Sequence, residues 1–411
     1  MGKRVLFTGA GAEVDLGFAS GCDFTNDTFY RKKSRLYNAL ETFYQNRLSR
    51  NEKSSLPDSY YSSFLFNSRG RAFKLLVDNL IHVKPDAVAE VLGKSKSSIQ
   101  DVSALEGSDL EKLFELLIIE NDSSDDKLRQ KALLREYESN QIHFGILESY
   151  YFDLLHPRDH PQRFWKLINF YWSAFFSILL PITDCLYKDV LDYEKDRYAF
   201  VLTHLDEVIK RVNNPSSFDR LIKSNTYYAK LKTKFDYVIT TNYTPYVTAL
   251  VSNQHSEVAR LAGCLSWFER LDTLEFDRYE DEDAFISEDT LIFPYLMCQS
   301  PVKPIISTNQ INEFSKAVGF LKEADEIVIL GYSFCDEDAH IASMVSSAIR
   351  NNPNMRIVYL DYTPVGETTD KLNKRKNALG SQLRLSKSEI DRIEIRGVYN
   401  CESEAFLELV G

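Results

Sequence analysis

Short runs of apolar residues lie near both ends of the chain, and each is followed by polar or turn-forming residues. They span residues 4–8, 237–241, 326–330, 356–360 and 392–396. Uninterrupted apolar runs of this length are typical of strands that are covered on both faces of a parallel sheet. We therefore predict five strands, one at the start of the chain and four in its last 175 or so residues.

Helical spacing of apolar positions separates the later strands, at residues 312–324 and 339–350. The second of these helices follows Asp336 and Asp338, which are candidate N-caps, and stops before Asn351-Asn352-Pro353. Strand and helix in alternation predict an α/β fold, with a Rossmann-like doubly wound parallel sheet.

The middle of the chain has helical periodicity only, at residues 110–120, 127–155, 164–180, 196–212 and 218–232, with polar loops at 51–58 and 120–126. We therefore expect a core made of residues 1–27 and 235–411. Residues 28–234 would form a large all-helical insertion, which could serve as an oligomer or partner interface.

The segment 164–182 has about the length of a membrane span, but Lys166 and Asn169 interrupt it. We expect a buried helix or a subunit interface there, and no membrane anchor. The net charge of −11 argues against nucleic acid as the default partner, although it leaves a local basic patch open.

Six cysteines are scattered along the chain and none forms a CxxC pair, so the sequence indicates neither a zinc ribbon nor a redox dithiol. We expect no zinc or other metal site. The scatter is typical of a reducing cytoplasm, and the first residues run into a strand without the apolar core of a signal peptide. We expect a cytoplasmic protein.

A glycine turn directly follows the first predicted strand, as Gly9, Ala10 and Gly11. Such a turn lets the backbone approach a pyrophosphate, whose charge is met by N–H groups and by the start of a following helix. The alternative is a tight turn with no ligand. A second cluster, Gly17 and residues 20–24 including Asp23 and Phe24, would close over the cofactor.

Polar residues also follow three later strands. Thr240 and Asn242 end the second strand, and Asn242 has both a donor and an acceptor, although it could equally be a helix N-cap. Gly331, Tyr332 and Ser333 follow the strand 326–330. Asp361 follows the strand 356–360, where an acid can accept hydrogen bonds from ribose hydroxyls or simply begin a turn.

In this order the segments resemble the sirtuin-like family. The turn Gly9–Gly11 is similar to its first phosphate loop, Thr240-Thr241-Asn242-Tyr243 to its catalytic Asn motif, and Leu261-Ala262-Gly263-Cys264 to its Leu-His-Gly-Ser motif. The segment 331–333 resembles its Gly-Thr-Ser segment beside the ribose, and 398–402, with Cys401, its adenine-contacting loop. The resemblance covers about half the chain and leaves the helical insertion unexplained.

The resemblance implies that NAD is the substrate. It places Asn242 and position 262 in catalysis, and it assigns cofactor contacts to Gly9, Ala10, Gly11, Asp23, Phe24, Thr240, Gly331, Tyr332, Ser333, Asp361 and Cys401.

Several departures from the family pattern matter. The zinc-binding cysteine pairs of deacylating sirtuins are absent, which points to the bacterial anti-phage branch, whose members hydrolyse NAD. Glu13 stands where many members have Ser, and Thr244 where many have Asp. Ala262 takes the place of the histidine general base, and an alanine cannot move a proton. We therefore expect this copy to be inactive.

Ala262 is either the natural residue or a replacement made to trap the cofactor. The residues around it otherwise keep the family motif, which favours the replacement. His255 is the one other histidine near enough in sequence to test as a substitute base.

Two other functions stay open: an NAD- or ADP-ribose-binding subunit without catalysis, and a partner-activated nuclease. By family analogy we expect a homo-oligomer, which could be paired with a HerA-type DNA-translocating ATPase, with the apolar helix 164–182 as a contact surface.

Overall fold

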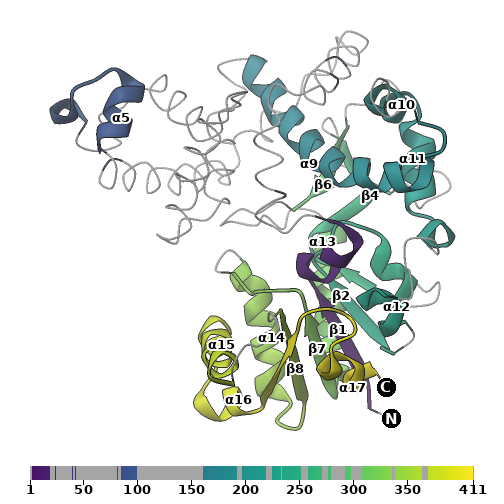
Figure 1. Cartoon of the computed structure of the whole chain (residues 1–411), viewed down its shortest axis with the longest axis vertical. Helices are drawn as coiled ribbons and strands as arrows, with labels where there is room; N and C mark the ends of the chain where they lie inside the picture. Colours follow the sequence, from purple (N-terminus) through teal and green to yellow (C-terminus); the bar gives the residue numbers. More distant parts are fainter. Residues whose placement is uncertain are drawn as a thin grey trace.

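The protein contains a six-stranded parallel sheet, which lies in the lower half of the view in Figure 1. The structure, a computed structural model, describes residues 2–18, 24, 39, 42, 81, 85–99, 161–191, 197–218, 225–232, 234–250, 258–270, 276–278, 292–297, 308–335, 338–362 and 369–410. The strands are β1 (Arg4–Thr8), β2 (Tyr237–Thr240), β3 (Val258–Arg260), β7 (Glu326–Leu330), β8 (Arg356–Tyr362) and β9 (Ile393–Val398).

The strand order is β3-β2-β1-β7-β8-β9, which is 3-2-1-4-5-6 when the strands of this sheet are counted along the chain. This is the order of the dinucleotide-binding Rossmann fold. The expected fold class is therefore confirmed. The topology reverses between β1 and β7, which places the ligand crevice of such folds at their carboxyl ends.

Strands β1 and β7 have the predicted bounds, whereas β8 and β9 run further than their apolar runs. The reason is pairing: the β8–β9 ladder continues through Asp361 opposite Gly397 and Tyr362 opposite Val398. The short strand β3 was not predicted as a separate strand, and it pairs with β2 through only three residues.

Helices cover both faces of the sheet. On one face, α13 (Thr308–Glu323), α14 (Ala339–Asn351) and α15 (Thr369–Gln382) pack on a core that includes Val5, Phe7 and Ile329, none of which is exposed to solvent. α16 (Lys387–Asp391) precedes β9. α12 (Tyr227–Leu231) and α17 (Glu404–Val410) contact each other through the rings of Tyr227 and Phe406, whose centroids are 5.0 Å apart.

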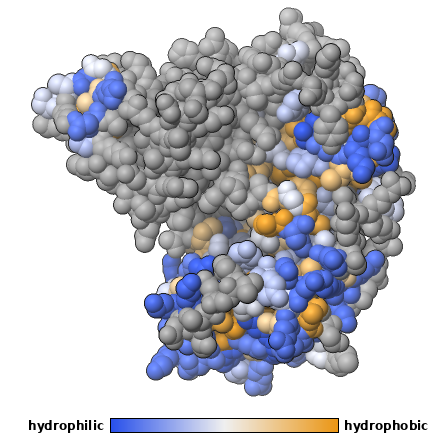
Figure 2. Space-filling model, in the orientation of Figure 1, coloured by the Kyte–Doolittle hydropathy of each residue, from blue (hydrophilic) through white to orange (hydrophobic). Residues whose placement is uncertain are grey.

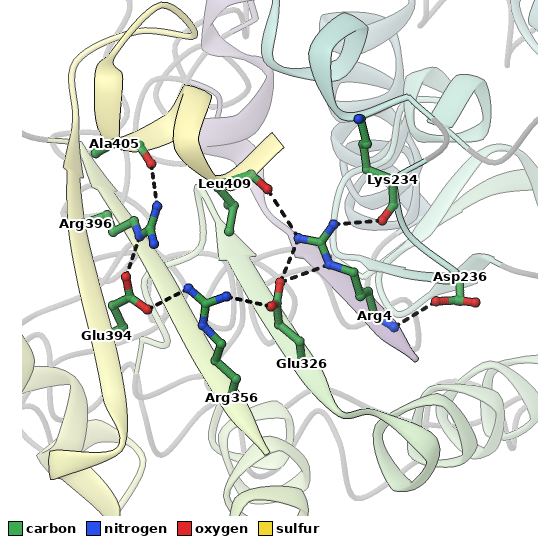
Figure 3. Close-up of polar contacts among 9 residues, drawn as sticks. All are labelled: Arg4, Lys234, Asp236, Glu326, Arg356, Glu394, Arg396, Ala405 and Leu409. Carbon is green, nitrogen blue, oxygen red and sulfur yellow. Dashed lines mark hydrogen bonds and ion pairs between the residues drawn. The ribbon is translucent and has the colours of Figure 1, made fainter. Parts of the chain in front are cut away.

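A ladder of alternating charges crosses the first residues of four strands (Figure 3). It joins Arg4 to Glu326 at 2.7 Å, Glu326 to Arg356 at 3.0 Å, Arg356 to Glu394 at 2.9 Å and Glu394 to Arg396 at 2.6 Å. Partly exposed ion pairs each contribute little to stability. Their positions matter more, because they hold the strand starts in register.

The same ladder anchors the C-terminal helix. Arg396 Nη1 donates to the Ala405 carbonyl at 3.0 Å, and Arg4 Nη2 donates to the Leu409 carbonyl at 3.5 Å. Figure 3 shows α17 lying across the ladder. The two ends of the chain are thus tied together at the amino edge of the sheet.

A second, antiparallel sheet of three strands was not predicted. Its order is β5-β4-β6, with β4 at Gly263–Arg270, β5 at Phe276–Arg278 and β6 at Ile292–Leu296. The long helix α9 (Pro161–Tyr187) packs against it: the rings of Trp172 and Phe175 lie 6.2 and 5.5 Å from that of Phe268. The region 235–411 therefore holds a small sheet as well as the Rossmann-like one.

The other helices that the structure describes are α5 (Pro85–Leu92), α10 (Arg197–Thr203) and α11 (Leu205–Val212), with 3-10 turns η1 (Ala10–Leu16), η2 (Lys96–Ser98), η4 (Pro215–Phe218) and η5 (Tyr246–Leu250). The predicted helix 196–212 is split at His204. Of the predicted helix 218–232, only α12 is described. The predictions at 110–120 and 127–155 lie outside the described residues.

The apolar segment 164–182 lies within helix α9, and its described side chains from Tyr171 onward are mostly buried. Trp172, Phe175, Phe176, Leu179 and Leu180 have no exposed surface, so they are covered by the chain itself rather than offered to another subunit. Across the described residues, none of the helices combines the length and apolar character that crossing a membrane requires. The described part of the surface around α14–α17 is mainly hydrophilic on the face shown in Figure 2.

Glu269 is a buried carboxyl in the small sheet. It is 3% exposed, it lies in register with Phe276 on β5 and Phe293 on β6, and its Oε2 has no hydrogen-bond partner among the described residues. Burial raises the pKa of Glu269 to about 7. The folded protein therefore binds a proton here that the unfolded chain releases near its ordinary pKa.

This carboxyl should make the protein less stable as pH rises. Its stabilising contribution is complete below the ordinary glutamate pKa and is lost as pH rises through about 7. We predict that Glu269→Gln, compared with wild type by urea unfolding, gains about 3 kcal/mol between pH 4.5 and pH 8. Parallel stability curves for the two proteins across that window would contradict the prediction.

Candidate functional site

Three turns meet at the carboxyl edge of the sheet. Because Thr8 pairs with both Thr240 and Leu330, the turns after β1, β2 and β7 begin at the same level. The Gly9 N–H donates to the Leu330 carbonyl at 3.1 Å, and the Gly11 N–H donates to the Gly331 carbonyl at 2.9 Å. The first glycine turn and the segment after β7 are therefore directly bonded at the point where the strand order reverses.

Glycine is required where these turns touch. Gly331 has a φ of 68°, and a Cβ there would lie 2.1 Å from the Ala12 nitrogen and 2.4 Å from the Gly11 carbonyl carbon. A Cβ on Gly11 would in turn lie 2.8 Å from the Gly331 Cα. The glycines of the two turns serve close backbone packing.

This packing changes what the first turn can offer a phosphate. The N–H groups of Gly9 and Gly11 are already used within the protein. The element that follows, η1, is a seven-residue 3-10 helix instead of the α-helix whose N-terminus we expected. Gly11 and Ser333 remain exposed at the surface of the site, and Ala10 is half-buried. Ser333 and the backbone of Ala10 are the positions best placed to meet a ligand.

Asn242 lies beside the first turn and is 5% exposed. Its Nδ2 donates to the Gly9 carbonyl at 3.0 Å and to the Tyr228 hydroxyl at 3.2 Å. The Thr240 hydroxyl accepts a hydrogen bond from the Asn242 backbone N–H and another from the Thr8 hydroxyl, both at 3.0 Å. Thr240 thus shapes the turn that carries Asn242.

Glu13 forms the other side of this network. Its Oε1 accepts hydrogen bonds from the Tyr228 hydroxyl at 3.0 Å and the Thr244 hydroxyl at 2.5 Å. Burial raises the pKa of Glu13 to about 7, although hydrogen bonds from Thr244 and Tyr228, the nearby Asn242 amide and the charge of Arg260 oppose the rise. Burial, together with the nearby Glu13 charge, also raises the pKa of Tyr228, so this phenol stays protonated.

The sequence did not assign a role to Tyr228 or Arg260. Tyr228 comes from α12, ahead of β2, and no local pattern marks it. Arg260 ends β3, is 6% exposed and donates through Nη1 to the Thr244 carbonyl at 3.1 Å. Glu13 had been noted only as a departure from the family pattern.

Position 262 is brought next to Asn242. The Leu261 N–H donates to the Thr240 carbonyl at 2.9 Å, and the Leu265 N–H donates to the Tyr243 carbonyl at 3.0 Å. The turn that contains Ala262 therefore runs alongside the one that contains Asn242, with a hydrogen bond on either side. Ala262 is 8% exposed, and its carbonyl accepts from the Met297 N–H at 2.8 Å.

The remaining predicted contacts lie further along the same edge. Asp361, 8% exposed, follows the β8 residue that pairs with Leu330, and one of its oxygens accepts from Arg375 Nε at 3.0 Å. Two strand spacings put it roughly 10 Å from the Gly9 turn. The Tyr332 hydroxyl donates to Asp338 at 2.6 Å, so this acid, at the N-cap position of α14, makes no side-chain cap.

Two predicted contacts flank these turns. Cys401 is buried after β9, and its carbonyl accepts from Lys230 Nζ at 2.9 Å. The Phe24 ring lies 5.7 Å from that of Tyr243. Asp23, His255 and Asp336 lie outside the described residues.

Within the part of the chain that the structure describes, no group of three or more His, Cys, Asp or Glu side chains is arranged to hold a metal. A cavity of about 800 Å³ lies between the end of α9, α11 and η4, and one of about 400 Å³ lies between α13 and α14. Both are away from the turns described above.

No protein-family model matches the chain, and no curated protein matches it either. Among solved structures, it is similar to a Sir2 homologue in complex with NAD, at 14% identity over 51% of this chain and 72% of that one, with a TM-score of 0.27. It is also similar to Sir2Tm bound to a propionylated peptide, at 17% identity over 47% and 79% of the two chains, with a TM-score of 0.25. TM-scores this low support no functional argument.

Close packing of the two turns gives a direct test. Gly331→Ala should destabilise the protein by roughly 3 kcal/mol, because it adds a steric clash to an unfavourable positive φ. Gly17→Ala is the matched control: Gly17 has a φ of 88° but no atoms within 4 Å of its would-be Cβ, so only the backbone cost of about 1 kcal/mol applies. Thermal or urea unfolding measures both, and equal losses would argue against the packing role.

Proposed function

We propose that the carboxyl edge of the sheet binds NAD, and that the active form of this site hydrolyses the bond between nicotinamide and ribose. The observation that carries the proposal is the placement of Asn242. Its amide is anchored by the Gly9 carbonyl at the switch point of a Rossmann-ordered sheet, next to the turn that carries position 262. Ligands of such sheets bind at this point.

The described residues offer suitable groups along the edge. Ser333 and the Ala10 backbone would contact the diphosphate, and the Asp361 carboxylate would accept from a ribose hydroxyl. Asn242 Oδ1 has no hydrogen bond among the described residues, so it would accept from water or a ribose hydroxyl near the bond that breaks.

Hydrolysis requires little covalent chemistry from the protein. Water adds to the ribose C1 as the C–N bond breaks through an oxocarbenium-like state. Nicotinamide leaves with the bonding electron pair, and one proton is released. Asn242 would contribute by orientation. A histidine at position 262 would take the proton, and the alanine present there cannot.

The wider biological role is proposed by family analogy. Absence of the paired zinc-binding cysteines supports the anti-phage branch over protein deacylation. In that setting the protein would be a cytoplasmic subunit of a homo-oligomer, and a HerA-type ATPase is a candidate partner.

Restoring the base should restore turnover. We predict that Ala262→His raises the rate of nicotinamide release from NAD on the order of 100-fold or more, with any activating partner present. Adding Asn242→Ala to that variant should remove the gain. The control is Ala89→His, in α5, which lies far from the sheet in Figure 1 and should leave the rate unchanged.

Calorimetry separates the alternative function from this one. A binding subunit without catalysis, which Ala262 favours if it is natural, would bind NAD and ADP-ribose and convert neither, even as Ala262→His. If the histidine variant neither binds nor cleaves NAD, the proposed function is wrong.

A further inference from the structure

Hydrogen-bond direction around Asn242 is set by a chain of three side chains. The amide group of Asn242 has two hydrogens, and both are donated, one to the Gly9 carbonyl and one to the Tyr228 hydroxyl. The Tyr228 hydroxyl has a single hydrogen, which it donates to Glu13. The phenol oxygen can accept from Asn242 because its own hydrogen points at Glu13.

The charge state of Glu13 decides whether this direction is unique. An ionised carboxylate only accepts, so Tyr228 must donate to it. A protonated Glu13 has an O–H of its own and can donate to the Tyr228 oxygen. The phenol hydrogen is then free to turn towards Asn242, where it would compete with the amide donor. Ionised Glu13 removes this competing donor, and it thereby reinforces the orientation, also held by the Gly9 carbonyl, that leaves Asn242 Oδ1 available.

The groups around Glu13 come from several elements, and besides the Asn242 amide they are two tyrosines, a threonine and an arginine. Tyr228 approaches from α12, Thr244 from the turn after β2, and Arg260 from the end of β3. Tyr246, on η5, is buried nearby, and burial followed by the Glu13 charge raises its pKa. Glu13 itself is 3% exposed, and its pKa is raised to about 7.

We propose that Glu13 is a positioning residue which, once it has lost its proton, locks Tyr228 and the Asn242 amide so that Asn242 Oδ1 faces the ligand. Affinity for NAD and ADP-ribose then rises as pH increases from 6 to 8. This inference rests on the proposed function for its ligand, but the orientation of the Asn242 amide can be observed without any ligand.

The first experiment is therefore ligand-free. Protein labelled with ¹⁵N-asparagine is titrated from pH 5.5 to 8.5, and the side-chain amide signal of Asn242 is assigned by its loss in Asn242→Asp. We expect this signal to shift with a midpoint near 7 in wild type and to stay constant in Glu13→Gln and in Tyr228→Phe. An Asn242 signal that is flat in wild type, or that titrates equally in Glu13→Gln, overturns the inference.

The second experiment measures binding by calorimetry with NAD and with ADP-ribose over the same pH range. Wild-type affinity should rise about 10-fold, and Glu13→Asp should keep part of this dependence. Glu13→Gln and Tyr228→Phe should bind weakly at every pH. Thr244→Val removes one hydrogen bond that lowers the pKa of Glu13, so it should move the rise to higher pH.

Glu269→Gln is the matched control, because Glu269 is also buried with a pKa of about 7 but lies in the other sheet. Its pH profile of binding should equal that of wild type. If Glu13→Gln binds with the same pH profile as wild type, the inference is wrong. If no protein binds NAD or ADP-ribose, the proposed function fails, and the Asn242 titration still decides the role of Glu13.

Discussion

Two backbone turns at the carboxyl edge of the sheet approach so closely that no side-chain carbon fits between them. Gly331 places its carbonyl 2.9 Å from the Gly11 nitrogen, and its missing Cβ would overlap Ala12. The strand pairing of β1 with β7 makes this approach unavoidable, since Thr8 and Leu330 are in register. It also fixes the Gly9 carbonyl, which holds the Asn242 amide. The position of Asn242 therefore depends on the close backbone packing of Gly11 against Gly331.

Sequence predicted the sheet well and the site only in part. Strands such as β1 and β7 can be recognised in the sequence as compact apolar runs, because strands covered on both faces of a sheet are mainly apolar. The antiparallel strand β5 has the residues Phe-Asp-Arg and carries no such signal. Likewise, Tyr228 meets Glu13 across 215 residues of sequence, and only the folded chain brings the two together.

Glu13 and Thr244 look unrelated in the sequence but are in contact in the structure. In the sequence, each is a separate departure from the family that the chain resembles, which has Ser at one position and Asp at the other. In the structure the two side chains touch, with the Thr244 hydroxyl donating to Glu13. The Thr244 hydroxyl and the Glu13 carboxyl therefore form one contact, which joins the first turn to the turn after β2.

Glu13 and Glu269 reach a similar pKa by different physical routes. Among the described residues no other group shifts the pKa of Glu269, so burial accounts for the rise. Glu13 has three hydrogen-bonding neighbours and a nearby arginine that all favour its charged form, so burial must raise its pKa more strongly there. Ionising Glu13 therefore lowers the stability of the folded protein, and the groups around Glu13 offset only part of this loss. A protein that stabilised this edge fully would keep Glu13 protonated, and would lose the single hydrogen-bond direction that orients Asn242.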